Sequence, residues 1–471
     1  MTSSRDFDTD FNAFSSLVDA VLSDVPSTGA KPGFSRAPGV IDVMGGIGED
    51  AGSLVLTGTA GVRFFCAVWP IAGDKIRLRI VNSATPAEQP LEFSIPVATL
   101  ASGSAESIAA QCKAKDAEWA APSILGIQKM TAEGGVPAPK SGLFILLEHD
   151  FPEMSDLGRH SAQTVATADA YCRAFGAQPD RFVLAKNCAD VVETLTDLRE
   201  LRKTITAVSS PARGSLLQMR FHPNVLCELL ELPAGIIVTA VATRLSRPTT
   251  IKRLIETRIC SEMGHRVILE LQNEDGVRVD PNQSRLSSIT PAEYVERYRD
   301  RMPTKVTQKQ FLTKFGSVRG LNDGDGANPK EVFKIRSRAE HHIYENKRVH
   351  EFATLLVRGR RGNTVESLLA AAELMFASHW SHSQRCGIGG VETDRLVNLI
   401  REAGASAGLF GAKVTAGGEG GEVVVLMRDD ARAHAALAKA AADAEEASSQ
   451  PVIIYEGALP SRVPPEPAGA V

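Results

Sequence analysis

Two glycine-rich stretches contain the residues with which this 471-residue chain could contact an anionic ligand. The first lies in VIDVMGGIGEDAGSLVL, residues 40–56, and the second is GAKVTAGGEGG, residues 411–421. Because glycine has no side chain, backbone N–H groups in such loops can approach a phosphate group. The same residues also suit tight turns, since glycine adopts positive φ angles without strain. One loop in each half favours a ligand-binding cleft between two domains, while the turn interpretation stays open for either loop alone.

The side chains that commonly bind metals lack the spacing of known metal sites. The ten histidines include the pair His341 and His342 and the segment SHWSH, with His379 and His382, and neither follows the HExxH pattern. The seven cysteines are scattered and form no CxxC pair, which argues against a thiolate zinc site and a disulfide framework. We therefore expect no metal site, histidines in structural roles and a reducing, cytoplasmic environment.

Composition excludes several classes of function. The net charge of −4 gives no overall attraction to nucleic acid or to anionic lipid, so we expect neither as a partner. No apolar run approaches the roughly 18 residues of a membrane-spanning helix. The N-terminus, MTSSRDFDTDF, lacks the hydrophobic segment of a secretory signal. With 43% hydrophobic residues, a chain of this length can bury the cores of two or three domains.

Apolar patterning in the first half predicts a sheet followed by helices. Residues 40–56 read as strand, turn and strand, and the runs VRFFCAVW, KIRLRIV and LEFSIPV predict an antiparallel sheet. The segment GLFILL, residues 142–147, suits a buried strand. AQTVATADAYCRAFG has helical spacing and ends at Gly176, a C-terminal cap, and a second helical stretch runs from about 180 to 202.

The second half repeats this mixture of elements. Strands are predicted at residues 234–241 and at EVVVLM, and a helix at residues 391–403. Residues 364–380 predict a helix capped by Asn363 or Thr364. The apolar face of that helix would consist of Val365, Leu368, Leu369, Ala372, Met375, Phe376 and His379. We expect an α+β protein with a flexible leader at 1–33, domains at 34–232 and 233–460, and a disordered Pro-rich tail at 461–471.

Several motifs resemble the GHMP small-molecule kinases. RAPGVIDVMGGIGEDAGSLVL is similar to their first signature, in the version of the galactokinase and arabinokinase branch, and GAKVTAGGEGG to their third signature. Further segments resemble the C-terminal domain of plant-type arabinokinases and related galactokinases: ITPAEYVERYRDRMP, IRSRAEHHIYENKRV, ELMFASHWSHS, TDRLVNLI and IIYEGALP. The resemblance runs from about residue 35 to 460 and is densest after residue 285.

This resemblance implies both a fold and an activity. The fold would combine an N-terminal domain of ribosomal-S5-like topology with a ferredoxin-like C-terminal domain, and the active site would lie between them. The activity would be transfer of the γ-phosphate of ATP, with Mg²⁺, to the anomeric hydroxyl of a monosaccharide of the galactose or arabinose class. The sugar-binding residues would be Asp42, Glu49, Gly417 and Gly418.

The first signature departs from the family at two positions. Val40 stands where active relatives have an arginine that stabilises phosphoryl charge, and loss of such a group costs about 10³–10⁵ in rate in other phosphoryl-transfer systems. Glu49 replaces an aspartate that binds sugar hydroxyls. Its carboxylate could still accept a hydroxyl proton, and the alternative is a solvated turn residue.

The second signature, normally GxSSSAA, corresponds to DLGRHSA at residues 156–162. In the family this turn leads into a helix whose N-terminus holds ATP phosphates. By the same resemblance, Gly158, Arg159, His160 and Ser161 would contact the nucleotide phosphates. A solvated helix start that happens to include a basic residue is the competing interpretation.

No catalytic base is found by alignment with the family. The run that carries its aspartate falls across LRELRKTITA, residues 198–207, and places the base at Thr204 or Ile205, neither of which accepts a proton at neutral pH. A positioned base typically contributes about 10²–10⁴-fold. A tyrosine that contacts sugar in relatives falls on Leu254. The catalytic residues are therefore unknown from the sequence.

Glu419 adds an acidic residue to the third glycine-rich loop. A carboxylate within about 4–6 Å of a phosphate is repulsive unless a cation intervenes. Either Glu419 points to solvent or the loop no longer holds phosphate, and the second interpretation agrees better with the other departures.

Two hypotheses follow. Family resemblance favours an ATP-dependent sugar-1-kinase. The altered positions favour a catalytically silent homologue that binds sugar or nucleotide as a sensor, or acts through a protein partner.

Overall fold

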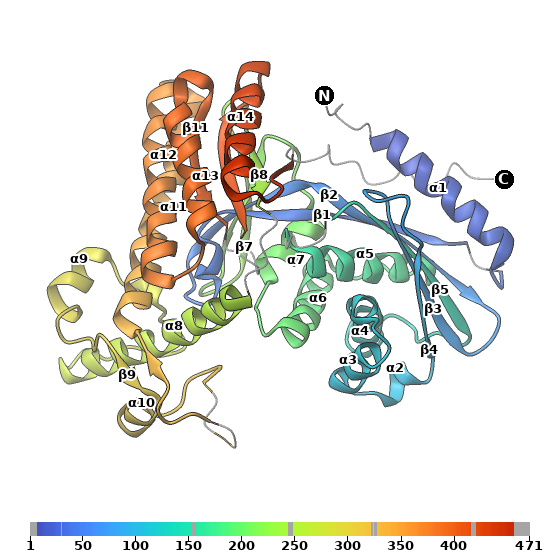
Figure 1. The fold of residues 1–471 in the computed structure, drawn as a ribbon. Helices are drawn as coiled ribbons and strands as arrows, with labels where there is room; N and C mark the ends of the chain where they lie inside the picture. Colours follow the sequence, from blue (N-terminus) through green and yellow to red (C-terminus); the bar gives the residue numbers. More distant parts are fainter. Residues whose placement is uncertain are drawn as a thin grey trace. The chain divides into compact units, whose positions relative to one another are not determined.

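The computed structural model describes residues 7–29, 31–152, 157–243, 248–321, 324, 327–415 and 421–455 (Figure 1). It contains two compact units. Unit 1 comprises the chain up to Val40 and Thr59–Arg213, and unit 2 comprises Ile41–Gly58 and Gly214–Tyr455. The units are discontinuous because strands β1 (Gly33–Met44) and β2 (Leu54–Ile71) each run from one into the other. This division differs from the expected single boundary between residues 232 and 233.

The sheet of unit 1 has the strand order β4-β3-β5-β2. Its strands are β3 (Lys75–Asn82), β4 (Leu91–Pro96), β5 (Gly142–His149) and the second part of β2. β3 and β4 are antiparallel as predicted, and β2 and β5 are antiparallel as well, whereas β3 and β5 are parallel, so the sheet is mixed and not antiparallel as expected. Parallel neighbours need a long crossover connection, and the helices between β4 and β5 provide it.

Helix α1 (Phe7–Asp24) covers one face of this sheet (Figure 1). Phe14 and Val18 are fully buried against alternate residues of β2, among them Phe65 and Trp69. The Phe14 and Phe65 rings are stacked with centroids 5.2 Å apart. The expectation of a flexible leader therefore does not hold for this segment, because its apolar face belongs to the core.

The remaining helices of unit 1 lie on the opposite face of the sheet (Figure 1). They are α2 (Thr99–Ser102), α3 (Ala105–Lys113), α4 (Ala121–Ala132), α5 (Arg159–Ala174), α6 (Arg181–Thr196) and α7 (Leu201–Ser209). The helical stretch predicted over residues 180–202 is two helices, because the chain adopts a φ of 58° at Asp197. Asp180 caps α6 by accepting hydrogen bonds from the N–H groups of Phe182 and Val183.

Unit 2 contains a second sheet, with the order β11-β12-β8-β13. Its strands are all antiparallel: β8 (Ile236–Ala242), β11 (Leu409–Val414), β12 (Glu422–Arg428) and β13 (Ile453–Tyr455). The accompanying helices are α11 (Ile335–Arg361), α12 (Thr364–Ser381), α13 (Val391–Ala403) and α14 (Ala431–Ser448). The predicted strands and helices of this half are confirmed, and so is the α+β class.

One predicted helix face needs correction. Met375 and His379 of α12 are fully buried, but Val365 is 50% and Leu369 is 46% exposed. The helical face therefore packs on β11 at its C-terminal part, while these two side chains lie outside the core. Asn363, expected as a cap, has left-handed backbone geometry and its side chain makes no capping hydrogen bond.

The rest of unit 2 is built around a separate helical core. It includes β6 (Ser215–Arg220) and β7 (Leu226–Glu231), which extend from the first part of β2, and α8 (Pro248–Glu274), α9 (Pro291–Glu293), β9 (Val306–Thr307), α10 (Gln308–Phe315) and β10 (Val332–Phe333). Five short helical turns complete this unit: η1 (Gly46–Glu49), η3 (Leu286–Ser288), η4 (Tyr294–Tyr298), η5 (His382–Cys386) and η6 (Ala405–Ala407). Among the described residues, no helix is long and apolar enough to cross a bilayer.

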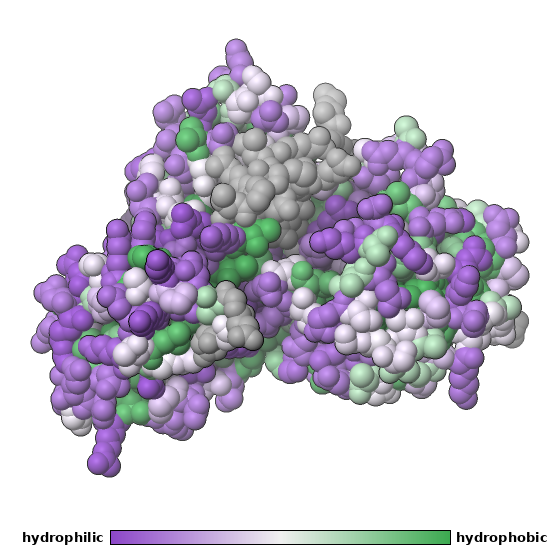
Figure 2. Space-filling view, turned by 60° about the horizontal axis from the view of Figure 1, so that its bottom comes forward, coloured by the Kyte–Doolittle hydropathy of each residue, from purple (hydrophilic) through white to green (hydrophobic). Residues whose placement is uncertain are grey.

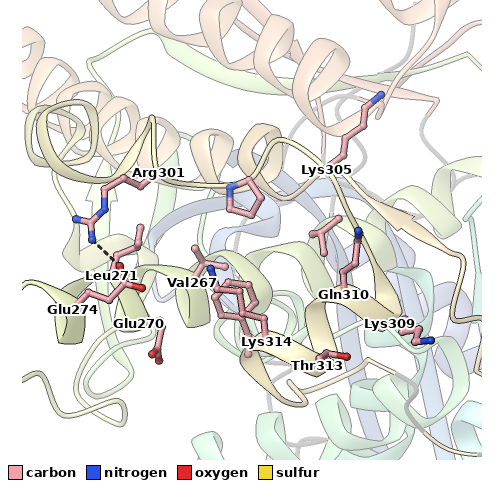
Figure 3. A pocket seen from close by; sticks show the side chains of 13 residues that line it. Val267, Glu270, Leu271, Glu274, Arg301, Lys305, Lys309, Gln310, Thr313 and Lys314 are labelled. Atoms are coloured by element: carbon pink, nitrogen blue, oxygen red, sulfur yellow. Dashed lines mark hydrogen bonds and ion pairs between the residues drawn. The ribbon is translucent and has the colours of Figure 1, made fainter.

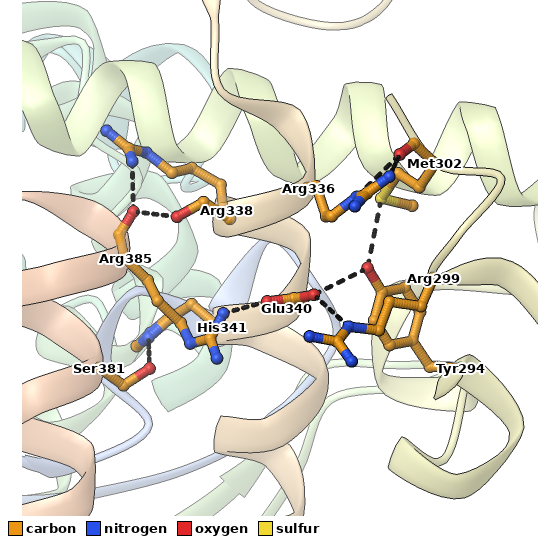
Figure 4. Close-up of polar contacts among 10 residues, drawn as sticks. Tyr294, Arg299, Met302, Arg336, Arg338, Glu340, His341, Ser381 and Arg385 are labelled. Atoms are coloured by element: carbon orange, nitrogen blue, oxygen red, sulfur yellow. Dashed lines mark hydrogen bonds and ion pairs between the residues drawn. The ribbon is translucent and has the colours of Figure 1, made fainter. Parts of the chain in front are cut away.

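A polar network fixes the N-terminal part of α11 in this core (Figure 4). The buried carboxylate of Glu340 accepts hydrogen bonds from the Tyr294 hydroxyl and the Arg299 guanidinium, each at 3.4 Å, and pairs with Arg385. Arg338 donates to the backbone carbonyl of Arg385. Helix α11 is thereby held against η4 and η5, which sets the positions of the charged residues farther along it.

Candidate active site

In unit 1, Val40, Gly158 and Lys203 lie close together at the start of α5. Gly158 caps this helix with a φ of 68°, in the left-handed region. A methyl group added to Gly158 would lie 3.3 Å from Cβ of Val40 and 3.4 Å from Cδ of Lys203. The backbone N–H of Val40 donates to the carbonyl of Leu157 at 2.7 Å. Val40 of the first signature and Gly158 of the second are therefore adjacent, and the side chain of Lys203 lies next to them.

Lys203 belongs to a buried polar cluster. Its ammonium lies 2.5 Å from the Glu200 carboxylate, and the Ser161 hydroxyl donates to the other carboxylate oxygen at 3.1 Å. Lys203 is 1%, Glu200 5% and Ser161 0% exposed. A cation and a proton acceptor thus lie together, in a region where burial strengthens their electrostatic interaction.

The start of α5 adds a favourable field for an anion. The N–H groups of a helix's first turn have no acceptor inside the helix, and the helix dipole places partial positive charge there. Of the residues predicted to contact phosphate, Ser161 is buried, Arg159 half-buried and His160 exposed. Burial, reinforced by the charge of Arg159, lowers the pKa of the nearby His149 to about 3, so this histidine is neutral. The solvated interpretation holds for His160 and is wrong for Ser161.

The positions aligned with the family's catalytic base hold no proton acceptor. Thr204 is fully buried and donates its hydroxyl to the carbonyl of Leu201, and Ile205 is buried as well. The turn of α7 that faces Gly158 presents Lys203 instead. Sequence reasoning missed Glu200 and Lys203 because RELRK looks like a solvated charged run. The available signal was their three-residue spacing, which allows a pair on one helical face.

In unit 2, two residues predicted to bind sugar are buried. Asp42 on β1 is 2% exposed, and Glu49 at the end of η1 is 4% exposed, so the solvated-turn interpretation of Glu49 is wrong. Asp42 interacts electrostatically with Lys413 of β11, the lysine of GAKVTAGGEGG. Residues 416–420, which include the predicted Gly417 and Gly418 and the acidic Glu419, lie outside the described residues.

Lys413 connects Asp42 to a second buried cluster. It is fully buried, and its ammonium donates to the carbonyl of Val414 at 2.8 Å. Burial lowers the pKa of Lys413, and the charges of Glu345 and Asp42 act in the opposite direction. Burial alone would raise the pKa of Glu345, but the charges of Arg348, of His382 once it is protonated at low pH, and of Lys413, with a hydrogen bond from Ser378, lower it to about 2. Glu345 is therefore the permanent anion of this cluster.

Three buried histidines surround that carboxylate and are neutral at pH 7. Burial, together with Lys413, lowers the pKa of His382 to about 3, and burial lowers that of His342 to about 4. Burial and the two neighbouring histidines also lower the pKa of His341. His382 Nδ1 donates to the Ser378 carbonyl at 2.9 Å. Within the described chain, no group of three or more His, Cys, Asp or Glu residues is arranged to hold a metal ion.

This cluster was also missed by sequence reasoning. His341, Glu345 and Arg348 are four and three residues apart on α11, so they share one helical face. That spacing was a usable signal. Leu254, aligned with a sugar-contacting tyrosine, is a buried residue of α8 and has no polar group to offer a ligand.

Comparison with known proteins identifies relatives by sequence, although no protein-family model matches the chain. L-arabinokinase of Arabidopsis thaliana is 25% identical over 487 residues, which cover 90% of this chain and 45% of the relative. Galactokinase of Lactococcus lactis subsp. cremoris is 28% identical over 178 residues, which cover 36% of this chain and 41% of the relative. The chain spans less than half the length of these curated relatives.

Solved structures share the fold. The structure of Lactococcus lactis galactokinase complexed with galactose superposes with a TM-score of 0.70 at 16% identity, over 95% of this chain and 98% of the other. Mevalonate kinase of Methanococcus jannaschii gives a TM-score of 0.56 at 13% identity, over 93% of this chain and 100% of the other. By sequence the chain is similar to the galactokinase and arabinokinase branch of the GHMP kinase superfamily, and its fold is the one that these solved kinases share. The resemblance of the signatures is therefore confirmed, and the superfamily's two-domain fold with it.

Proposed function

We propose that the chain is a cytoplasmic, ATP-dependent kinase that phosphorylates a monosaccharide of the galactose or arabinose class at its anomeric hydroxyl. The observation that carries this proposal is the Glu200–Lys203 pair beside Gly158. The signatures lack the family's arginine at Val40 and its aspartate base, and this pair supplies a cation and a proton acceptor to replace them. The sequence relatives, an arabinokinase and galactokinases, support the substrate class.

The residues at the start of α5 fit the phosphates of a nucleotide. The first-turn N–H groups and the ammonium of Lys203 are donors of the kind that bind phosphate oxygens. The hydroxyl oxygen of Ser161 is of the kind that Mg²⁺ prefers. When bound, ATP with Mg²⁺ would supply the transferred phosphoryl group.

Each buried group then has a distinct role. Glu200 takes the proton of the anomeric hydroxyl, which makes that oxygen nucleophilic. Lys203 offsets negative charge on the phosphoryl oxygens, in a region of low dielectric where such compensation is most effective. We also propose that Asp42, Glu49, Gly417 and Gly418 bind the sugar hydroxyls, with Lys413 close enough to Asp42 for their charges to interact.

The experiment is an assay of ADP release with ATP, Mg²⁺ and a panel of free monosaccharides that includes galactose and arabinose. The expected result is turnover in the usual kinase range of about 1–100 s⁻¹ with one class of sugar. Identification of the product as a sugar 1-phosphate by ³¹P NMR distinguishes it from ATP hydrolysis. No turnover with any sugar would contradict the proposal.

A second candidate function is a silent homologue that binds the same ligands as a sensor, or acts through a protein partner. Val40 favours it, since this apolar side chain lies beside Gly158 where a charge would be needed. Isothermal titration with ATP, galactose and arabinose separates the two functions. Binding without turnover supports the sensor, and no heat with any ligand leaves only the role through a protein partner.

A further inference from the structure

A cavity of about 580 Å³ lies between α8 and α10 in unit 2 (Figure 3). None of its lining residues belongs to the site described above. Small-molecule sites in proteins typically enclose about 300–1,000 Å³, so the cavity is large enough for a ligand. Its apolar surface comes from Val267, Leu271, Val306 and Phe315, which are buried members of the adjoining core. The cavity wall is therefore built on a rigid, packed base.

The packing of α10 against α8 sets the shape of this base. The Arg266 guanidinium on α8 donates to the carbonyl of Phe315 at the end of α10, at 2.9 Å. Thr307 caps α10 at its other end, because its hydroxyl accepts from the N–H of Gln310 and the Gln310 side chain accepts from the N–H of Thr307. Both ends of the short helix are thus fixed.

Charge is distributed unevenly around the cavity (Figure 3). At one end, Arg301 is neutralised by ion pairs with Glu274 and Asp275, at 2.9 and 2.8 Å. Lys305 and Lys309 lie at the opposite end, and within the described chain neither forms an ion pair. Glu270 adds a carboxylate on the α8 side, so the cavity offers an apolar middle, an acidic side and a cationic end.

Lys314 extends this pattern toward the centre. Its ammonium lies 5.1 Å from the centroid of the Phe315 ring, a cation–π arrangement above the apolar floor. In the space-filling view, apolar areas lie among hydrophilic side chains over the part of unit 2 that contains α8 and α10 (Figure 2). An apolar surface next to uncompensated ammonium groups matches a ligand with an apolar body and an anionic head.

We propose that this cavity binds a small amphipathic anion, namely an alkyl or aryl chain that ends in a single carboxylate or phosphate. The chain lies on Val267, Leu271 and Phe315, and the anionic head lies at the end of the cavity where the exposed lysines Lys305 and Lys309 provide positive charge. The site is independent of the proposed kinase site, because it uses none of that site's residues. It gives the protein a second ligand whose chemistry differs from that of a sugar.

The test uses decanoate, below its micelle-forming concentration, in isothermal titration with the full chain. Decanoate is expected to bind at least tenfold more tightly than decyltrimethylammonium, which has the same chain and the opposite charge. The double variant Lys305→Gln/Lys309→Gln should weaken decanoate binding by about tenfold. The matched control Lys330→Gln/Lys334→Gln, which changes two exposed lysines outside the cavity, should leave it unchanged.

A second variant tests the apolar part. Thr313 is an exposed residue of the cavity wall, so Thr313→Trp fills the space without disturbing the core and should abolish decanoate binding while thermal stability is kept. Decyl phosphate should behave as decanoate does. Equal binding of both head-group charges, or unchanged decanoate binding in either cavity variant, would overturn the proposal. Co-sedimentation with vesicles of phosphatidylserine and phosphatidylcholine, without decanoate binding, would assign the cationic end to a lipid surface instead and would also overturn it.

Discussion

The buried polar clusters around Glu200 and around Glu345 compensate their charges in different ways. In unit 1, the ammonium of Lys203 lies 2.5 Å from the carboxylate of Glu200, which also accepts a hydrogen bond from Ser161. In unit 2, the carboxylate of Glu345 interacts with Arg348 and, together with Asp42, with Lys413, and the histidines around it stay neutral at pH 7. The second cluster therefore depends on the protonation state of several groups.

This difference indicates that the cluster around Glu200 is suited to catalysis, whereas the cluster around Glu345 is suited to a structural role. A carboxylate and an ammonium next to a helix N-terminus can accept a proton and offset the charge of a bound anion. The second cluster joins α11, α12, η5 and β11 through hydrogen bonds and charges, and its strength varies with pH. Substitutions in the two clusters should therefore have different effects on turnover, on the free energy of unfolding and on its pH dependence.

The largest effect is expected from Lys203→Met. Removal of the ammonium takes away the cation that lies 2.5 Å from the buried carboxylate of Glu200, which should lower the free energy of unfolding by about 3–5 kcal/mol. Turnover in the sugar-kinase assay should fall about 10³-fold or more, because the phosphoryl charge loses its cation. Urea denaturation and ADP release measure the two quantities.

The double variant Glu200→Gln/Lys203→Met is the control for this prediction. It removes both charges, so most of the lost stability should return while turnover stays low. Turnover within tenfold of the unmodified chain in the single variant would refute a catalytic role for the pair.

The next largest effect is expected from Glu345→Gln in unit 2. This change leaves Lys413 and Arg348 without their shared anion, and the free energy of unfolding should fall by about 3 kcal/mol. The matched control is Glu351→Gln on the same helix, where the exposed carboxylate pairs with Lys347 at 3.6 Å. That control should change stability by no more than about 0.5 kcal/mol. Equal losses in both variants would show that α11 tolerates no charge change, rather than that the cluster depends on Glu345.

The histidines of unit 2 predict a pH dependence of stability. His382 titrates at about 3 in the folded chain, below the unfolded value near 6.5, so the unfolded state binds the proton first. Stability is complete above pH 6.5 and declines as the pH falls toward 4.5. Glu345, with a folded pKa of about 2, contributes to the decline only below about 4.5.

His382→Asn tests this prediction, because the asparagine amide can still donate to the Ser378 carbonyl. The slope of unfolding free energy against pH should decrease by as much as about 1.4 kcal/mol per pH unit between pH 6.5 and 4.5. Residual slope is expected from His341 and His342, which are also neutral in the fold. An unchanged slope in urea denaturation series would contradict the assignment.

The smallest effect compares two glycines with nearly the same backbone geometry. Gly158 has a φ of 68° and Gly176 a φ of 65°, so alanine at either costs about 1 kcal/mol through backbone strain. A methyl group at Gly176 meets nothing within 4 Å, whereas at Gly158 it meets Val40 and Lys203. Gly158→Ala should therefore be more destabilising than Gly176→Ala by a few tenths of a kcal/mol to about 1 kcal/mol. Equal unfolding free energies would mean that the space around Gly158 is less tightly packed.

Local patterns in the sequence were sufficient for most of the elements. Residues 391–403 form the helix predicted from their spacing, and the valine-rich EVVVLM forms β12. Periodicity depends only on neighbouring residues, so a single sequence contains it. The family assignment followed from motifs of the same local kind. The parallel pairing of β3 with β5 could not be found in this way, since it depends on where the crossover helices pack.

The functional clusters were decided only by tertiary structure. Glu200, Lys203 and Ser161 come from two helices, and the run RELRK has the composition of a solvated surface. Whether a charge is solvated or buried depends on what packs over it, and Gly158 of a distant segment covers Lys203. The sequence by itself determined the elements and the superfamily, because both reside in local patterns. The tertiary structure decided which charges meet, because burial and Coulomb interactions act between residues that the chain order separates.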